Sequence, residues 1–455
     1  MTFDVVNPTS GEKADTFDTM DTDEIQARIT AADNAYRQWK AVQVDQRAAP
    51  MREAARILES EKESQATLMA KEMGKPISDG RAEIEKCAWV CRHYADNARQ
   101  MLAAEDIPTD AGKSYVVFTP LGVVLGVMPW NYPFYQVFRF GIPAMMAGNT
   151  VLLKHSANVP GCALAIQAVM QKAGLPDAVF QSLQIPSGQV QQVIDHRAVK
   201  AIALTGSNAA GQAVASRAGH RIKKCVLELG GSDPYLILKD ADLDLTVEAC
   251  AAGRLLNSGQ SCIAAKRFIV VDAVRDAFEQ GLVQKMEAVR MGNPLDEQTR
   301  IGPLAGGGFR DILHQQVRRS IDKGARLLLG GEIPSGRGFF YPPTVLTDVR
   351  PGMPVFDEET FGPVAAVVPA ADEAEAIDLA NQTDFGLGAA VFSRDVARGE
   401  RIAAEQLEAG NCFVNAFVRS DPRLPFGGIK QSGYGRELSH YGIKSFVNIK
   451  TVYVR

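Results

Sequence analysis

The stretch AIALTGSNAAGQAVASRAG, residues 201–219, decides the fold. An apolar run ends at Gly206 and Ser207, Gly211 follows, and the remainder has a helical pattern. This order of strand, glycine turn and helix is typical of a βα unit. Glycines at such a turn let a ligand approach the backbone, and a helix N-terminus offers free N–H groups to a phosphate. Because Gly-x4-Gly is not the GxGxxG fingerprint, the stretch alone also fits a tight turn without a ligand.

The same alternation of short apolar runs and helical stretches extends in both directions from this unit. The nearest runs are GVVLGVMPW (122–130), TVLLKHS (150–156), CVLELGG (225–231) and YLILKD (235–240). They predict βαβ units around a parallel sheet that is buried on both faces. Beyond Pro234, a second set of runs predicts a second α/β domain: RFIVVDA (267–273), ARLLLGG (325–331) and PVAAVV (363–368).

Two further regions flank these patterns. Residues 22–103 are predicted to be helical, because apolar side chains recur there at three- and four-residue spacing: Ile25, Ile29, Ala32, Tyr36 and Trp39. Cys87 and Cys91, four positions apart on another such face, are interpreted as core packing. The strand-like segments 113–120 and 445–455 lie outside both domains. Isolated strands need a pairing partner, and the expected one is another subunit.

Composition narrows the class of protein. The 455 residues have a hydrophobic content of 46% and a net charge of −4 with both signs interspersed. They indicate a globular enzyme of two or three domains, without nucleic acid or membrane as partner. The first 18 residues lack the pattern of a signal peptide, so the cytoplasm is the expected location. The seven cysteines form no CxxC pair and the six histidines are isolated, so no metal site is predicted.

Three side chains are candidates for chemistry. Cys262, in NSGQSCIAAKR (257–267), lies among small and polar residues that keep its thiol approachable. Glu228, in VLELGGSDP, is a carboxylate within an apolar strand, where burial raises the pKa toward that of a general base. Asn131, in PWNYP, has an amide that can donate to an oxyanion. Taken singly, each also fits a structural role: a buried thiol, a solvated strand face and a turn.

Together with EETFGPV (358–364) and PFGGIKQSGYGRE (425–437), these motifs resemble those of the aldehyde dehydrogenase superfamily. Their order, from PWNYP through ELGG and GQSC to PFGG, spans residues 129–428. The resemblance implies an α/β protein with three parts. A Rossmann-type cofactor domain takes residues 1–102 and 121–231, a catalytic α/β domain 232–430, and an oligomerisation arm 103–120 and 431–455. A homodimer or homotetramer is therefore expected.

The resemblance also implies a mechanism. Cys262 attacks an aldehyde to give a thiohemiacetal, whose oxyanion is held by the Asn131 amide and the Cys262 backbone N–H. Hydride passes to the nicotinamide, which leaves a thioester, and Glu228 activates the water that hydrolyses it. An acylating enzyme that transfers the thioester to CoA is the rival within the family, and Glu228 argues against it. A non-catalytic structural protein is the rival outside it.

The cofactor contacts implied by the resemblance are Trp130, Lys154, Ser156, Ala157, Gly206, Ser207, Gly211, Leu229, Glu359 and Phe361. Relatives that prefer NAD often have an acidic residue three positions after the strand-end lysine, where this chain has Ala157. A 2′-phosphate then meets no carboxylate beside Lys154. We therefore expect NADP or NAD as cofactor, with NADP slightly favoured.

Within the superfamily the chain looks closest to the bacterial succinate-semialdehyde dehydrogenases, through QVFRF, LLKHSANVP and FGGIKQSGYGRELSHYG. A substrate with a distal carboxylate needs a cation or several donors. Arg139 follows Asn131 by two helical turns, which would return it to the aldehyde entrance, and Ser420 could add a hydroxyl. Arg139 also fits a surface ion pair, and Arg423 is an alternative contact. Glutarate semialdehyde or an uncharged aliphatic aldehyde remain alternative substrates.

Overall fold

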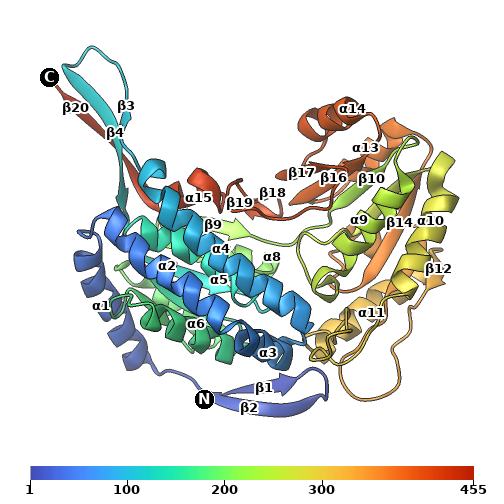
Figure 1. Cartoon of the computed structure of the whole chain (residues 1–455), viewed down its shortest axis with the longest axis horizontal. Helices are drawn as coiled ribbons and strands as arrows, with labels where there is room; N and C mark the ends of the chain where they lie inside the picture. Colours follow the sequence, from blue (N-terminus) through green and yellow to red (C-terminus); the bar gives the residue numbers. More distant parts are fainter. Residues whose placement is uncertain (1) are drawn as a thin grey trace.

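The computed structural model describes residues 2–455, and its main body consists of two sheet-based units (Figure 1). The predicted helical region is confirmed as four helices: α1 (Thr22–Trp39), α2 (Val44–Ser60), α3 (Lys62–Met73) and α4 (Ile77–Met101). Asp21 caps α1, since its side chain accepts the Glu24 N–H and the Glu24 carboxylate accepts the Asp21 N–H. Cys87 and Cys91 are fully buried on α4, as their spacing predicted.

The first sheet has six strands in the order β19-β9-β8-β5-β6-β7. Its strands are β5 (Val123–Met128), β6 (Thr150–His155), β7 (Phe180–Ser182), β8 (Val199–Thr205), β9 (Lys224–Glu228) and β19 (Gly433–Tyr434). All neighbours are parallel except β19, which pairs antiparallel with β9. The connecting helices are α5 (Tyr135–Met146), α6 (Pro160–Lys172), α7 (Val190–Asp195) and α8 (Asn208–His220). The predicted parallel sheet is thus confirmed.

The second sheet has seven strands in the order β12-β13-β14-β11-β10-β16-β17, and only β12 runs antiparallel to its neighbour. Its strands are β10 (Pro234–Ile237), β11 (Arg267–Val271), β12 (Arg326–Leu329), β13 (Thr344–Thr347), β14 (Val364–Ala370), β16 (Gly388–Phe392) and β17 (Asn411–Val414). Its helices are α9 (Leu243–Leu255), α10 (Asp272–Glu287), α11 (Gly307–Asp322), α12 (Pro354–Asp357), α13 (Glu373–Asn381) and α14 (Val396–Arg401). The predicted second α/β unit is confirmed.

The two strand-like segments outside these units pair with each other. β4 (Lys113–Pro120) lies antiparallel between β20 (Val447–Val454) and β3 (Glu105–Asp106), and this arm projects from the body (Figure 1). The arm was expected to begin again at residue 431. Before β20, however, β19 joins the first sheet and α15 (Ser439–Lys444) packs on α4 and α5. The domain division stays a prediction.

Two small antiparallel pairs complete the chain: β1 (Thr2–Asn7) with β2 (Glu12–Asp18), and β15 (Phe385–Gly386) with β18 (Ile429–Lys430). Among residues 2–455, no helix combines the length and apolar character needed to cross a bilayer. The segments that follow β5, β8 and β9 leave the first sheet at one edge, because the carboxyl ends of parallel strands meet there. That edge carries PWNYP, the Gly206 turn and ELGG, and so it forms one wall of the site.

Candidate active site

The loop that carries Cys262 is held by an unusual backbone. After α9, Asn257 and Ser258 have φ of 55° and 56°, and Gly259 has φ of 74°. A β-carbon at Gly259 would overlap the carbonyl of Gly362, so only glycine permits this close approach to the EETFGPV loop. The GQSC and EETFGPV motifs are therefore in close backbone contact near the Cys262 thiol.

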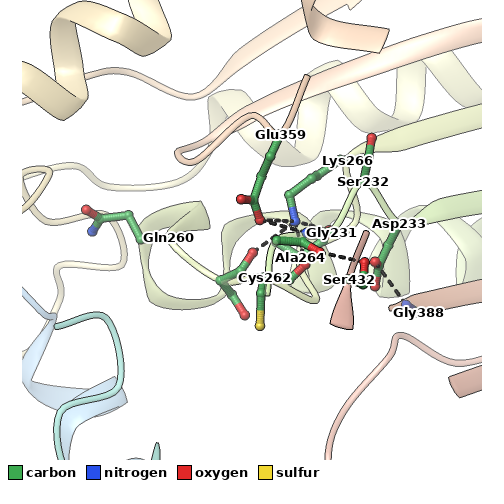
Figure 2. A network of polar contacts seen from close by, with 12 residues as sticks. Gly231, Ser232, Asp233, Gln260, Cys262, Ala264, Lys266, Glu359, Gly388 and Ser432 are labelled. Carbon is green, nitrogen blue, oxygen red and sulfur yellow. Dashed lines mark hydrogen bonds and ion pairs between the residues drawn. The ribbon is translucent and has the colours of Figure 1, made fainter. Parts of the chain in front are cut away.

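Lys266 clamps the backbone of this loop. Its buried ammonium donates to the carbonyl oxygens of Ser261 at 3.1 Å and Cys262 at 2.6 Å, and lies 3.7 Å from a Glu359 carboxylate oxygen (Figure 2). The Cys262 sulfur points away from this contact (Figure 2). Burial raises the pKa of the Cys262 thiol to about 12, against the lowering effect of the Arg139 and Lys266 charges. The thiol is therefore neutral at pH 7 without ligands.

Asn131 is joined to the Cys262 loop by hydrogen bonds. Its amide nitrogen donates to the Gln260 carbonyl at 3.1 Å, and its amide oxygen accepts from the Gln136 side chain at 3.1 Å. Asn257 donates to the Asn131 carbonyl at 2.8 Å and to that of Gln260 at 3.0 Å. Gln136 thus turns the NH₂ of Asn131 toward the nucleophile loop, with one N–H left to donate. This arrangement suits an oxyanion donor.

Glu228 ends β9 with its carboxyl group buried, and neither oxygen has a hydrogen-bond partner among residues 2–455. Burial raises its pKa well above the usual range, while Arg139 lowers it and Glu437 raises it further. Arg139 is ion-paired with Glu437. Arg436 lowers the pKa as well, but burial outweighs both arginines, so Glu228, which has no ion pair of its own, keeps its proton. This confirms the direction of the pKa shift expected from its apolar strand.

Two cavities meet at Cys262 and Gln136. The first has a volume of about 730 Å³, including its open mouth, and is called here the substrate-side cavity. Its lining residues include Tyr132, Tyr135, Arg139, Lys86, Arg419 and Ser420. The second, of about 930 Å³, is called the cofactor-side cavity, and its lining includes Trp130, Asn131, Gly206, Ser207, Leu229, Glu359 and Phe361. A thiol at this junction can reach ligands from both sides.

The cofactor-side cavity fits a dinucleotide. Ser207 is the N-cap of the 13-residue helix α8, whose first N–H groups face the Gly206 turn. A β-carbon at Gly206 would meet only atoms 3.8 Å away or more, so the protein itself does not require glycine there. The ring of Phe361 stands edge-to-face on Trp130 at 5.7 Å between centroids. A β-carbon at Gly211 would overlap the Leu229 side chain, so packing requires glycine there, and the role of Gly211 as a cofactor contact stays a prediction.

The remaining predicted cofactor residues lie at and just beyond the end of β6, outside the described lining of this cavity. The Lys154 ammonium has no hydrogen bond or ion pair among residues 2–455, and burial lowers its pKa. His155 is fixed between the Pro133 carbonyl and the Ser156 N–H, and burial lowers its pKa to about 4. The Ser156 hydroxyl donates to Asn158, and Ala157 is exposed. Within the described part of the chain, Lys154 is thus a cation without a hydrogen-bond or ion-pair partner.

Both predicted substrate contacts line the substrate-side cavity. The helix expected after PWNYP is α5, and Arg139 on it is buried. Its charge is already balanced by Glu437, and it also donates to Thr205 at 3.2 Å. Its role as carboxylate ligand stays a prediction, whereas the alternative of a surface ion pair is wrong. Ser420 shares a hydrogen bond with Tyr135 at 2.8 Å.

Arg423, the alternative contact, pairs with Asp421 and is not among the lining residues. Sequence reasoning missed Gln136, Lys266, Glu437 and Lys86. The partners of Lys86 and Glu437, which are Ser420 and Arg139, come from distant parts of the chain. Gln136 and Lys266 have partners nearby, and the apolar residues around these two were the signal for a buried role.

The fold and the site indicate a class of enzyme. The Cys262 thiol and the Asn131 amide line one cavity, and the buried carboxyl group of Glu228 and the thiol both lie near the Arg139 charge. The sequence profile of the Aldehyde dehydrogenase family matches residues 1–452, and the chain belongs to that family. It is 44% identical over 448 residues to succinate semialdehyde dehydrogenase (NAD(P)+) Sad of Escherichia coli strain K12, covering 98% of this chain and 97% of that one.

Two further relatives agree. The chain is 46% identical to the succinate-semialdehyde dehydrogenase (NADP+) of Deinococcus radiodurans over 450 residues, covering 99% of this chain and 94% of the relative. The crystal structure of succinic semialdehyde dehydrogenase from Streptococcus pyogenes, in complex with NADP+, superposes with a TM-score of 0.97 at 36% identity. That match covers 99% of each chain. The predicted family and fold are confirmed.

Proposed function

We propose that this protein oxidises succinate semialdehyde to succinate with NADP or NAD, through a thiohemiacetal and a thioester on Cys262. The observation that carries this proposal is the position of the thiol, where a cavity with cationic side chains meets a cavity suited to a dinucleotide. The relatives named for succinate semialdehyde support the substrate.

The residues divide the chemistry as follows. The Cys262 thiol loses its proton to water as the sulfur bonds to the aldehyde carbon and the carbonyl π pair moves to oxygen. The resulting oxyanion accepts hydrogen bonds from the Asn131 amide and the Cys262 N–H. When bound, a nicotinamide accepts hydride from the thiohemiacetal carbon. Glu228, once ionised, takes a proton from the water that hydrolyses the thioester. Its buried carboxyl, with no other partner, supports hydrolysis over transfer to CoA.

NADP is favoured on electrostatic grounds. A 2′-phosphate needs a cation and the absence of a nearby carboxylate. Lys154 has no hydrogen-bond or ion-pair partner from residues 2 to 455, and position 157 is an alanine and not an acid. Lys154, Ser207 and Glu359 are the proposed ligands of the phosphate and ribose groups.

The arm supports a homo-oligomer. On β20, Ile449 is 62% exposed and Tyr453 is 54% exposed. Apolar side chains on a projecting edge strand are costly in water and are covered by pairing with another chain. We propose that the arm joins two or four copies of this chain, with light scattering of the arm-truncated protein (residues 1–446) against the full chain as the check.

The proposed reaction is tested by kcat/KM for succinate semialdehyde, glutarate semialdehyde and butanal, each with NADP and NAD. We expect succinate semialdehyde to exceed butanal by at least tenfold, with NADP equal to or better than NAD. Equal values for the two aldehydes would overturn the substrate, and a strong NAD preference would overturn the cofactor proposal.

A further inference from the structure

A cation that sequence analysis passed over lies in the substrate-side cavity. Lys86, on α4, lines this cavity together with Ser420 and Cys262. Its ammonium donates to the Ser420 hydroxyl at 2.8 Å and lies 4.5 Å from the centre of the Tyr135 ring. These two contacts hold the ammonium at the cavity wall.

Lys86 has no acidic partner. Arg139 in the same cavity is ion-paired with Glu437, and the buried Lys75 nearby is ion-paired with Glu83. Among residues 2–455, no carboxylate lies within ion-pair distance of the Lys86 ammonium. An ammonium has three N–H donors, and Ser420 takes one of them. Since a desolvated charge without a counter-ion is costly, the arrangement calls for an anion from outside the chain.

The acids that share this cavity are already engaged. Asp79 accepts the Asn257 N–H at 3.0 Å, and burial raises the pKa of its carboxyl. Glu83 accepts two backbone N–H groups at the start of α5 besides its bond to Lys75. Within residues 2–455, an incoming carboxylate therefore meets two lining cations that have no carboxylate at ion-pair distance, Lys86 and the exposed Arg419.

We propose that Lys86, with the Ser420 hydroxyl, binds the distal carboxylate of the aldehyde substrate and so determines selectivity for charged semialdehydes. The inference rests on the proposed function, because it assigns the recognition of that substrate. Arg139 then serves as the fixed partner of Glu437 and supplies background positive potential. The carboxylate completes the ion pair that Lys86 lacks.

The proposal has a consequence for pH dependence. Burial, helped by the charges of Arg139 and Arg419, lowers the pKa of Lys86 to about 8, against the raising effect of Cys87 and Asp421. Lys86 is therefore charged below pH 8 and loses its proton above that value. The ratio of kcat/KM for succinate semialdehyde to that for butanal should be constant below pH 7.5 and fall above pH 8. Taking the ratio cancels the titration of Cys262 and Glu228, which act on both substrates.

The test compares Lys86→Met, Lys86→Arg and the control Lys71→Met, an exposed lysine on α3 away from the cavity. Thermal unfolding first establishes that each variant is folded. Lys86→Met should lose tenfold to a hundredfold in kcat/KM for succinate semialdehyde and less than twofold for butanal. Lys86→Arg should retain most of the preference, and Lys71→Met should match the wild type.

The outcomes separate the two proposals. If the wild type prefers succinate semialdehyde but Lys86→Met keeps that preference, Lys86 is not the anchor and the proposed function stands. If the wild type shows no preference, the proposed substrate fails, and inhibition of butanal oxidation by succinate decides on Lys86. Tenfold weaker inhibition of Lys86→Met then supports the carboxylate site, and equal or absent inhibition overturns it. If Lys86→Met fails to fold, the pH profile of the wild type decides, because a flat ratio overturns the proposal.

Discussion

The two cavities that meet at Cys262 are built in different ways. The cofactor-side cavity is lined by the turns at the carboxyl ends of β5, β8 and β9, together with Phe309, Ile312, Glu359 and Phe361 from the second unit. The substrate-side cavity is formed by side chains from α4, α5 and two separate loops. Turns at strand ends leave short glycine-containing motifs in the sequence, whereas a wall of side chains from separate elements leaves no such motif. The comparison predicts that a single substitution in the cofactor-side cavity disturbs only nearby contacts. A single substitution in the substrate-side cavity should disturb contacts in several elements.

The largest expected effect lies in the substrate-side wall. Glu83 pairs with the fully buried Lys75 and accepts the N–H groups of Phe134 and Tyr135 at 2.8 and 2.9 Å. Glu83→Gln leaves Lys75 buried without a counter-charge, which should cost about 3–5 kcal/mol of stability. Chemical denaturation measures it, with the exposed Glu85→Gln as control at about 0–1 kcal/mol. Equal losses in both variants would contradict the structural role of Glu83.

The next effect lies where the two cavities share a wall. Asn131→Ala removes the proposed oxyanion donor, and the loss of one such donor lowers kcat by about 10²–10³. Gln136→Ala leaves the amide in place but frees its orientation, so its kcat should fall less. Steady-state kinetics with succinate semialdehyde or with butanal measures kcat for both variants. A change confined to KM would show that Asn131 only binds substrate.

On the cofactor side the expected effect is smaller and specific. Ala157→Glu places a carboxylate beside the expected 2′-phosphate site, and like-charge repulsion at this exposed position should lower the NADP/NAD ratio of kcat/KM roughly tenfold. Ala157→Gln is the uncharged control and should keep the wild-type ratio. If both substitutions change the ratio alike, the effect is one of size and not of charge.

The last prediction concerns the Cys262 sulfur and needs no substitution. Because burial raises the pKa of Cys262 to about 12, its thiolate fraction should rise about tenfold per pH unit between pH 7 and 9 without ligands. Peptide-resolved mass spectrometry of iodoacetamide labelling follows Cys262 separately from the partly exposed Cys225 and Cys412. A labelling rate that levels off below pH 8 would show a thiol activated in the free enzyme.

Sequence predicted the parts of the molecule whose signal is local. The parallel sheets, the helices before residue 103, the helix after PWNYP and the buried Glu228 were all readable from neighbouring residues. Lys86 was not, because a lysine on an amphipathic helix has the same pattern whether it faces solvent or a cavity. The Arg139–Glu437 pair joins residues 298 positions apart, and no spacing rule reaches that far. The pairing of β19 with β9 across the fold could not be predicted for the same reason, and the arm boundary at residue 431 stays a prediction.

The central claim is that an aldehyde from one cavity becomes a thioester on Cys262, which Glu228 then helps to hydrolyse. The most direct measurement is mass spectrometry of Glu228→Gln mixed with succinate semialdehyde and NADP, alongside stopped-flow absorbance of NADPH. We predict a rapid burst of NADPH, slow turnover and a succinyl group mapped to Cys262. Turnover of Glu228→Gln at the wild-type rate without an adduct, or an adduct on another residue, would contradict the account.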